Sequence, residues 1–384
     1  MLRVLGIIVV FLLAAAAGIF FFVVPARVDA SLNRVIPHDP YPISEASASF
    51  HSTLRLADLH DDALLWDRDF LKRASRGHTD APRLAEGGYR LQVLAAVTKT
   101  PKNLNYDKNT GDTDNITPLA IAQRWPVQTW TSLAERALHI ADKLKRYEVR
   151  SGGRVRLVTT RADLAAGIEK NGLNVILATE GAHPLEGDLA NVDRLYAAGY
   201  RILGLQHFFD NELGGSLHGV SGAGLTEFGR AAVSSARERG MIIDVAHSSE
   251  AVVRDVLAMT DAPLIVSHTG LRGHCDSPRN LPDDLMKEIA DRGGLIGVGF
   301  WDGAVCDATL TSIANAIVYA VGLLGVEHVA LGSDFDGATS TPLDASEAIA
   351  LTDALLRHGL GEEEIKAVMG ENAIRFMIEN LPDE

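Results

Sequence analysis

Apolar positions after residue 50 form eight short runs, and most of the stretches between them have helical spacing, such as Thr226–Arg239 and Leu310–Leu324. The runs are Leu54–Leu59, Leu91–Thr98, Asn174–Thr179, Tyr200–Gln206, Met241–Ala246, Leu264–Ser267, Leu295–Phe300 and His328–Ser333. Runs of this length alternating with amphipathic segments are typical of βα units and a parallel sheet. Eight such units predict a closed (β/α)8 TIM-like barrel. A doubly wound sheet would need a glycine-rich phosphate loop after its first strand, and none follows Leu59.

The first residues have a different pattern. Every residue from Leu5 to Val24 is apolar or glycine, and this length of helix would span about 30 Å, the thickness of a bilayer core. We therefore expect residues 1–25 to be an uncleaved transmembrane anchor rather than a signal peptide, whose apolar region is usually shorter. A small residue at Ala30 keeps cleavage open as the alternative. Residues 26–50 are predicted to be a linker and 51–384 the barrel domain.

Composition narrows the class of partner. Hydrophobic residues make up 47% and charged residues 22% of the chain, as in ordinary globular proteins. The net charge of -14 argues against nucleic acid as a partner, because phosphate binding needs clustered Lys and Arg. Only Cys275 and Cys306 are cysteines, which excludes a CxxC zinc site. A disulfide between them is an alternative, but their isolation favours two unpaired residues.

Residues able to bind a metal or carry a proton follow six of the eight runs. They are Asp58-Leu-His-Asp-Asp62, Glu180-Gly181, His207, His247-Ser248, His268 and Asp334-Phe-Asp-Gly337. In a barrel of this kind the carboxyl ends of all strands meet at one rim, where active sites lie. A single histidine at a strand end is more often structural, but six such positions at one rim favour a metal site.

The residue types indicate a catalytic metal site. Imidazole and carboxylate ligands suit Zn²⁺, Mn²⁺ or Co²⁺, and a carboxylate such as Glu180 can bridge two ions. The spacing His60-x-Asp62 places both side chains on one side of an extended segment. His78-Thr-Asp80 has the same spacing but precedes a helix-like stretch, so we predict a loop or capping role. His328 lies at the amino-terminal end of its strand and is predicted to be structural.

The motifs together resemble the renal or membrane dipeptidase family, zinc metallopeptidases of the amidohydrolase superfamily. The similarity runs from about Leu54 to Phe376. Besides the strand-end motifs, the matching segments are Thr79-Asp-Ala-Pro-Arg-Leu-Ala-Glu-Gly-Gly88, Ile243-Asp-Val-Ala-His-Ser248, Ser267-His268, Arg279-Asn-Leu-Pro-Asp-Asp284, Gly332-Ser-Asp-Phe-Asp-Gly337 and Gly370-Glu-Asn-Ala-Ile-Arg375. Their order and spacing, rather than any one motif, make the resemblance specific.

The resemblance implies a binuclear zinc site. His60 and Asp62 would bind one Zn²⁺ ion, His247 and His268 the other, and Glu180 would bridge them. The family's reaction is hydrolysis of the peptide bond of a dipeptide by a hydroxide that bridges the two ions.

The resemblance also implies roles for the remaining motif residues. Asp334 would shuttle the proton, and His207 would contact the substrate, polarise its carbonyl and stabilise the oxyanion. Arg279 would bind the substrate carboxylate, with Asn280 beside it.

Three segments depart from the better-known members and are expected to line the substrate pocket: Phe208–Gly215, Trp301 and the polar insertion Lys99–Gln128. Two other functions stay open: hydrolysis of N-acyl amino acids or small lactams, and an inactive membrane-bound binding protein. The animal relatives are lipid-anchored at the carboxyl end. Here we expect an amino-terminal anchor, a catalytic domain exported to the periplasmic or extracellular side, and a homodimer as a possible state.

Overall fold

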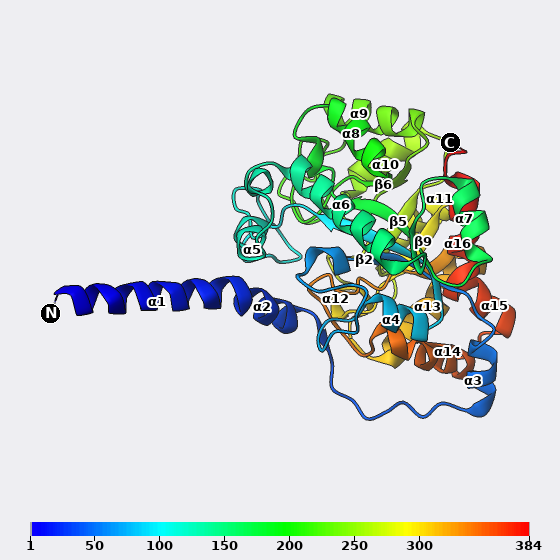
Figure 1. Cartoon of the computed structure of the whole chain (residues 1–384). Helices are drawn as coiled ribbons and strands as arrows, with labels where there is room; N and C mark the ends of the chain where they lie inside the picture. The colour runs from blue at the N-terminus through cyan, green and yellow to red at the C-terminus, as the bar shows by residue number, and fades with distance from the viewer. Residues whose placement is uncertain (1, 384) are drawn as a thin grey trace.

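A closed barrel of eight parallel strands lies at the centre of the protein in a computed structural model, which describes residues 2–383 (Figure 1). Pairing of β3 with β5 closes the ring. The barrel strands are β2 (Leu56–Asp61), β3 (Tyr89–Val97), β5 (Leu173–Glu180), β6 (Tyr200–Gly204), β7 (Ile242–Asp244), β8 (Ile265–Thr269), β9 (Leu295–Val298) and β10 (Val329–Leu331). The predicted TIM-like fold is confirmed, and each of the eight predicted runs contains or overlaps one barrel strand.

Three short strands were not predicted. β4 (Val155–Leu157) pairs with β5 outside the ring, and β1 (Arg34–Val35) pairs with β11 (Ser340–Thr341). A segment of two or three residues is too short to show an alternating pattern, so periodicity could not reveal them.

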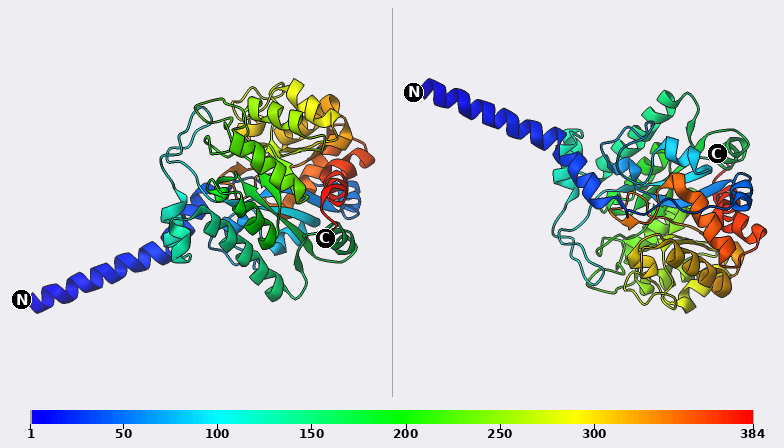
Figure 2. Two further views of the ribbon diagram at one scale, coloured as in Figure 1. Left: turned by 90° about the horizontal axis from the view of Figure 1, so that it is seen from above. Right: turned by 90° about the horizontal axis from the view of Figure 1, so that it is seen from below.

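Helices surround the barrel, as the views in Figure 2 show. Their ends follow local signals: Thr226, Ser249 and Thr309 each accept a backbone N–H bond at the start of a helix. The helices on the barrel are α3 (Glu45–His51), α4 (Ala81–Glu86), α6 (Leu133–Ser151), α7 (Arg161–Ile168), α8 (Ala190–Ala198), α9 (Glu227–Glu238), α10 (Glu250–Met259), α11 (Asp283–Asp291), α12 (Asp302–Val305), α13 (Leu310–Leu324), α14 (Ala348–Arg357), α15 (Glu362–Lys366) and α16 (Asn372–Asn380). They bury an apolar face against the outer side of the strands.

Strand β3 shows why the strands read as continuous apolar runs. Leu91, Val93 and Ala95 belong to one buried apolar cluster, while Leu94 and Ala96 belong to another. Because successive side chains of a strand point to opposite faces, both faces of β3 are buried.

The N-terminal helix projects from the barrel (Figures 1 and 2). α1 (Leu2–Phe22) is followed after Val23 by α2 (Val24–Leu32), and most of the apolar side chains of α1 are exposed. The stretch Arg3–Leu32 is long and apolar enough to cross a membrane by length and composition. The predicted linker 26–50 includes most of α2, all of β1 and most of α3, and the division of the chain into three segments remains a prediction.

Cys275 and Cys306 form a disulfide with an S–S distance of 2.03 Å. The expectation of two unpaired cysteines is therefore wrong. Isolation in sequence is a poor guide here, because consecutive βα loops meet at the barrel rim. The two cysteines follow the neighbouring strands β8 and β9, and their Cα atoms lie 5.5 Å apart despite a sequence separation of 31.

Candidate active site

The predicted metal-binding side chains lie together at the carboxyl rim of the barrel. His60 is in β2, Glu180 ends β5, His268 is in β8, and His247 follows β7. All four side chains are at least 95% buried, as are most of their neighbours. Four strands from different parts of the chain, β2, β5, β7 and β8, thus bring these side chains into one cluster.

Glu180 is at the centre of this cluster. Its Oε1 atom lies 3.5 Å from Nε2 of His60 and 3.3 Å from Nε2 of His207. The same oxygen lies 3.3 Å from Nε2 of His247 and 3.4 Å from Nε2 of His268. Four imidazole nitrogens converging on one carboxylate oxygen is a geometry suited to a bridging ligand between metal ions.

The cluster contains three groups of side chains whose residue types are those of metal sites. In each group the ligand atoms lie within 4.8 Å of one another. The groups are His60 with Asp62 and Glu180, His60 with His268 and Asp334, and Glu180 with His207 and His247. His60 Nε2 and Asp62 Oδ1 are buried and have no hydrogen-bond partner, so a cation would satisfy them.

The electrostatics of the cluster also favour cations. Burial, and then the negative charge of Asp62, raises the pKa of Glu180 well above its usual range. Burial raises the pKa of Asp334 to about 8, although the charge of His60 acts in the opposite direction. Burial also lowers the pKa of His247 and His268, so both imidazoles stay neutral and keep a lone pair for a ligand bond. Buried carboxylates that oppose one another's ionisation are stabilised by bound metal.

The ligand rings are held in place by neighbouring polar groups. Ser267 Oγ lies 2.9 Å from Nδ1 of His268 and 3.3 Å from Nδ1 of His60. Asp244, buried below them, accepts a bond of 3.0 Å from the backbone N–H of Ser267. Such outer contacts fix the orientation and tautomer of metal-binding histidines.

Backbone conformation is unusual at two of the site residues. His247 has φ of 61° and Asp334 has φ of 59°, values that residues other than glycine rarely adopt. Such conformations persist where the surrounding structure determines them, and they concentrate at functional sites. Here they turn the chain directly after β7 and β10.

A cavity of about 550 Å³ opens above the cluster. The three segments that depart from the family pattern all contribute to its lining, through Phe208, Trp301 and residues of the Lys99–Gln128 insertion. The insertion contains α5 (Ile116–Ala122), and Leu104, Ile116 and Leu119 form part of the cavity wall. The three segments thus line one cavity, and binding of the substrate in this cavity remains a prediction.

Arg279 reaches the cavity from the loop after β8. Its side chain is almost fully buried, and its Nη2 donates a bond of 2.7 Å to the carbonyl of His268. The guanidinium lies over the ring of Trp301, with 5.4 Å from Cζ to the ring centroid. Its Nε is buried without a hydrogen-bond partner. A buried donor without a partner at a cavity wall is suited to an anionic ligand.

Asn280 lies differently. Its side chain accepts a bond of 2.8 Å from the N–H of Gly270 and donates bonds of 2.9 Å to the carbonyls of Cys275 and Ala304. These backbone bonds hold together the loops after β8 and β9. Asn280 is not among the cavity-lining residues, and its role in substrate binding remains a prediction.

Tyr106 is a cavity residue that sequence reasoning did not single out. Its hydroxyl accepts a bond of 2.9 Å from Nε1 of Trp301, and its backbone carbonyl accepts one of 2.8 Å from Nδ1 of His218. Burial raises the pKa of Tyr106 to about 12, so the hydroxyl keeps its proton. The signal in the sequence was that Tyr106 lies in the polar insertion Lys99–Gln128, which departs from the family pattern.

The two histidines predicted to be structural have structural contacts. The backbone N–H of His78 donates to Asp336 Oδ1 at 2.7 Å, and the ring Nδ1 of His78 accepts the backbone N–H of Asp336 at 2.9 Å. Asp80 caps α4 by accepting the N–H of Arg83, as the capping interpretation predicts. His328 Nδ1 lies 2.9 Å from the carbonyl of Gly294.

Known proteins share this architecture. Residues 45–381 match the family model described as membrane dipeptidase (peptidase family M19). Dipeptidase 3 of Rattus norvegicus is 30% identical over 346 residues, which cover 83% of this chain and 66% of the rat protein. A crystal structure of a metallopeptidase of family M19, dipeptidase AC, is 25% identical with a TM-score of 0.72, covering 86% of this chain and 100% of that one.

A second solved structure is a metallopeptidase from Rhodobacter sphaeroides, bound to a phosphinate mimic of the dipeptide L-Ala-D-Ala. It is 24% identical with a TM-score of 0.69 and covers 86% of this chain and 99% of that chain. The family match spans all eight barrel strands and includes every residue of the buried cluster described above. The chain belongs to the membrane dipeptidase family and is a peptide hydrolase that uses metal.

Proposed function

We propose that the protein is a zinc dipeptidase that hydrolyses dipeptides with a free carboxylate, using two Zn²⁺ ions. The observation that carries the proposal is the position of Glu180, with four imidazole nitrogens within 3.5 Å of one oxygen, next to the unpartnered guanidinium nitrogen of Arg279. The first feature suits two metal ions, and the second suits the carboxylate of a small substrate.

His60 and Asp62 would hold one ion, His247 and His268 the other, and Glu180 both. When bound, two such ions lower the pKa of water and polarise a carbonyl oxygen. A neutral nitrogen and carboxylate set without thiolates is the kind that catalytic zinc uses.

His207 is placed to act on the substrate carbonyl. Burial lowers the pKa of His207 well below its usual value, so its imidazole is neutral. Its Nδ1 is buried without a partner, and the residue lines the cavity. A neutral N–H donor aimed at the carbonyl oxygen would stabilise negative charge as it develops there.

Asp334 is the proposed proton carrier. It lines the same cavity, and its carboxylate belongs to a group with His60 and His268. From this position it would accept the proton of the attacking water and deliver it to the leaving amine. Arg279 would meanwhile hold the substrate carboxylate, which fixes the scissile bond relative to Asp334.

One observation favours the alternative substrate class, N-acyl amino acids. The cavity wall opposite the polar cluster is apolar, with Leu104, Ile116 and Leu119 from the insertion. An acyl chain could pack there as well as an apolar side chain.

The test is turnover by the zinc-loaded full chain against a library of L,L- and L,D-dipeptides, with each good substrate repeated as its N-acetylated form. A dipeptidase prefers the free amine. Equal or faster cleavage of the acetylated compounds would instead identify an N-acyl amino acid hydrolase, and no turnover of either class with full metal content would leave a binding protein.

We propose that α1 anchors the protein in a membrane and that the barrel lies on the exported side. The exposed apolar surface of α1 and the disulfide between Cys275 and Cys306 support it, because disulfides persist in oxidising compartments.

A further inference from the structure

We propose that α2 forms part of the active site. Asp29 positions the loop that carries Asp334, and the apolar face of α2 closes one side of the substrate cavity. The inference rests on the proposed function, because it assigns Asp334 a place in catalysis. It also implies that the active enzyme keeps this segment rather than losing it by cleavage after Ala30.

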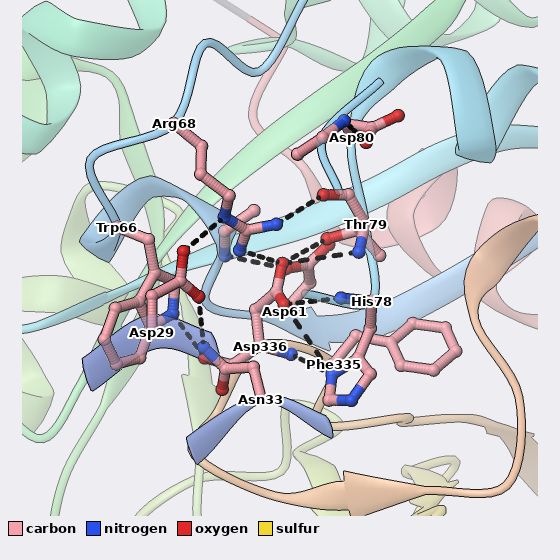
Figure 3. A network of polar contacts seen from close by, with 12 residues as sticks. Asp29, Asn33, Asp61, Trp66, Arg68, His78, Thr79, Asp80, Phe335 and Asp336 are labelled. Atoms are coloured by element: carbon pink, nitrogen blue, oxygen red, sulfur yellow. Dashed lines mark hydrogen bonds and ion pairs between the residues drawn. The ribbon is translucent and has the colours of Figure 1, made fainter. Parts of the chain in front are cut away.

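Asp29 is a buried carboxylate that joins α2 to the barrel, as Figure 3 shows. Its side chain is 1% exposed. Its Oδ2 lies 2.6 Å from Nε of Arg76 and 3.1 Å from Nε of Arg68, and its Oδ1 accepts a bond of 2.9 Å from Asn33. Removing one partner of a buried ion pair is strongly destabilising locally, because the other charge stays buried.

The same network reaches the loop after β10. Nη2 of Arg68 lies 2.5 Å from Oδ2 of Asp336 (Figure 3), and the side-chain oxygen of Asn33 accepts a bond of 2.9 Å from the N–H of Ala338. The loop from Asp334 to Ala338 is therefore bonded to α2 through Arg68 and directly through Asn33.

This loop needs such support. Asp334, Asp336 and Ala338 all have φ near +60°, a conformation costly for these residues. Further bonds hold Asp336: Trp66 Nε1 donates to its carbonyl at 2.7 Å, and Thr79 Oγ1 donates to its carboxylate at 2.8 Å. Asp336 thus anchors the loop two residues from Asp334, and Arg68, held by Asp29, faces its carboxylate.

The N-terminal helices also shape the cavity. Val24, Val28 and Leu32, spaced by four residues on one face of α2, line it together with Phe20 of α1. Arg124 of the insertion donates a bond of 3.2 Å to the carbonyl of Phe21, at the end of α1. A substrate side chain in the cavity would contact residues that lie before the predicted barrel domain.

The test uses the full chain in detergent with its metal bound. Asp29→Asn keeps the shape of the side chain but removes its charge. We expect kcat on a small dipeptide to fall about 10- to 100-fold, as for a displaced catalytic group, with little change in KM and an unchanged metal content. Asp39→Asn is the matched control, because this substitution makes the same charge change at an exposed position in the same segment.

A second variant covers the case in which Asp29→Asn fails to fold. Asn33→Ala removes the bond to the Ala338 N–H and leaves both ion pairs of Asp29. We expect a smaller fall in kcat and faster hydrogen exchange at the Ala338 amide. Exchange does not require turnover, so it tests the inference even if dipeptides prove not to be substrates. An unchanged kcat in both variants, with wild type active, or an unchanged exchange rate in Asn33→Ala, would overturn it.

A third variant tests the cavity wall. Val28→Ser should raise KM for dipeptides with large apolar side chains and leave KM for glycylglycine unchanged, because only the larger side chain reaches α2. Equal KM changes for both substrates would show that α2 does not contact substrate.

Discussion

His247 has a left-handed backbone, a neutral imidazole and a short approach to Glu180, all of which suit a metal ligand. Changing His247 to Ala should lower the metal content of the purified protein and reduce kcat more than about 100-fold. Even the loss of a residue that only contacts a metal ligand lowers metal affinity or activity by about 10- to 100-fold. Metal analysis beside thermal unfolding checks this, with His328→Ala as a control on a histidine outside the cluster. Wild-type turnover with an unchanged metal count would contradict the ligand assignment.

Asp334 is distinguished from a simple ligand by a different experiment. Asp334→Asn is nearly isosteric but cannot accept a proton, so kcat should fall by about 10²–10⁴ while the metal content stays unchanged. Steady-state kinetics and metal analysis on one preparation measure both quantities. Loss of metal would make Asp334 a ligand, and a change in KM alone would make it a substrate contact.

A substitution of Arg279 tests whether the enzyme recognises the free carboxylate of a dipeptide. Arg279→Met should cost about 2–5 kcal/mol in kcat/KM on a dipeptide, as expected for truncating one partner of a buried charge pair. A dipeptide amide has no carboxylate to lose, so the same change should matter little there, and wild type should prefer the free acid. Equal losses on acid and amide would show that Arg279 only holds its loop, through its bond to the carbonyl of His268.

For single residues, the sequence predicted the site where a residue type that can bind metal follows an apolar run directly. A polar residue directly after an apolar run, such as Glu180 or His268, can be placed at the rim from the barrel topology alone. Asp29 could not be placed, because its partners Arg68 and Arg76 are distant in sequence and no motif links the three residues. Asn280 is a different case: its motif predicted substrate binding, which remains a prediction, but could not reveal the backbone bonds of its amide.

Among the elements, α6 offers a test that is independent of the metal site. His139 packs on the ring of Trp125, and burial, together with the charges of Lys143 and Arg146, lowers its pKa from 6.5 to about 4. Above pH 6.5 the group is neutral in both states, so it contributes nothing. As pH falls towards 4, the unfolded chain takes up a proton that the folded one does not, so stability falls.

The comparison is the melting temperature of His139→Gln and of wild type across this range. The difference between variant and wild type should shift in favour of the variant as pH decreases from 6.5 to 4. Metal loss in acid affects both proteins alike and cancels in the difference. A pH-independent difference would mean that His139 is protonated equally in both states.

For helices, strands and loops, prediction was limited by the length of the element and by contacts between segments distant in sequence. Strands of the barrel were predictable because burial on both faces leaves a continuous apolar run, as in β3. β1, β4 and β11 are too short for any pattern. The disulfide was missed because contact between loops is a property of the closed barrel, which sequence separation does not express.

For the whole molecule the prediction concerns the N-terminal segment. If the anchor is retained, the mature protein should have the mass of the full chain, stay with the membrane fraction after alkaline carbonate washing, and need detergent for release. Mass spectrometry of the purified mature protein decides the matter. A mature N-terminus at Ser31 would show cleavage after Ala30, and the protein would then lack Asp29 altogether.

The link between Cys275 and Cys306 has a consequence for the biogenesis of the enzyme. The bond joins two loops of the finished barrel and can form only where thiols are oxidised. With the export proposed above, the chain would cross the membrane before this bond forms, and translocation would precede the last step of maturation. Recombinant protein made in a reducing cytoplasm would carry two thiols, one of them in the loop that holds Arg279, so secreted production is the appropriate route to protein with this disulfide.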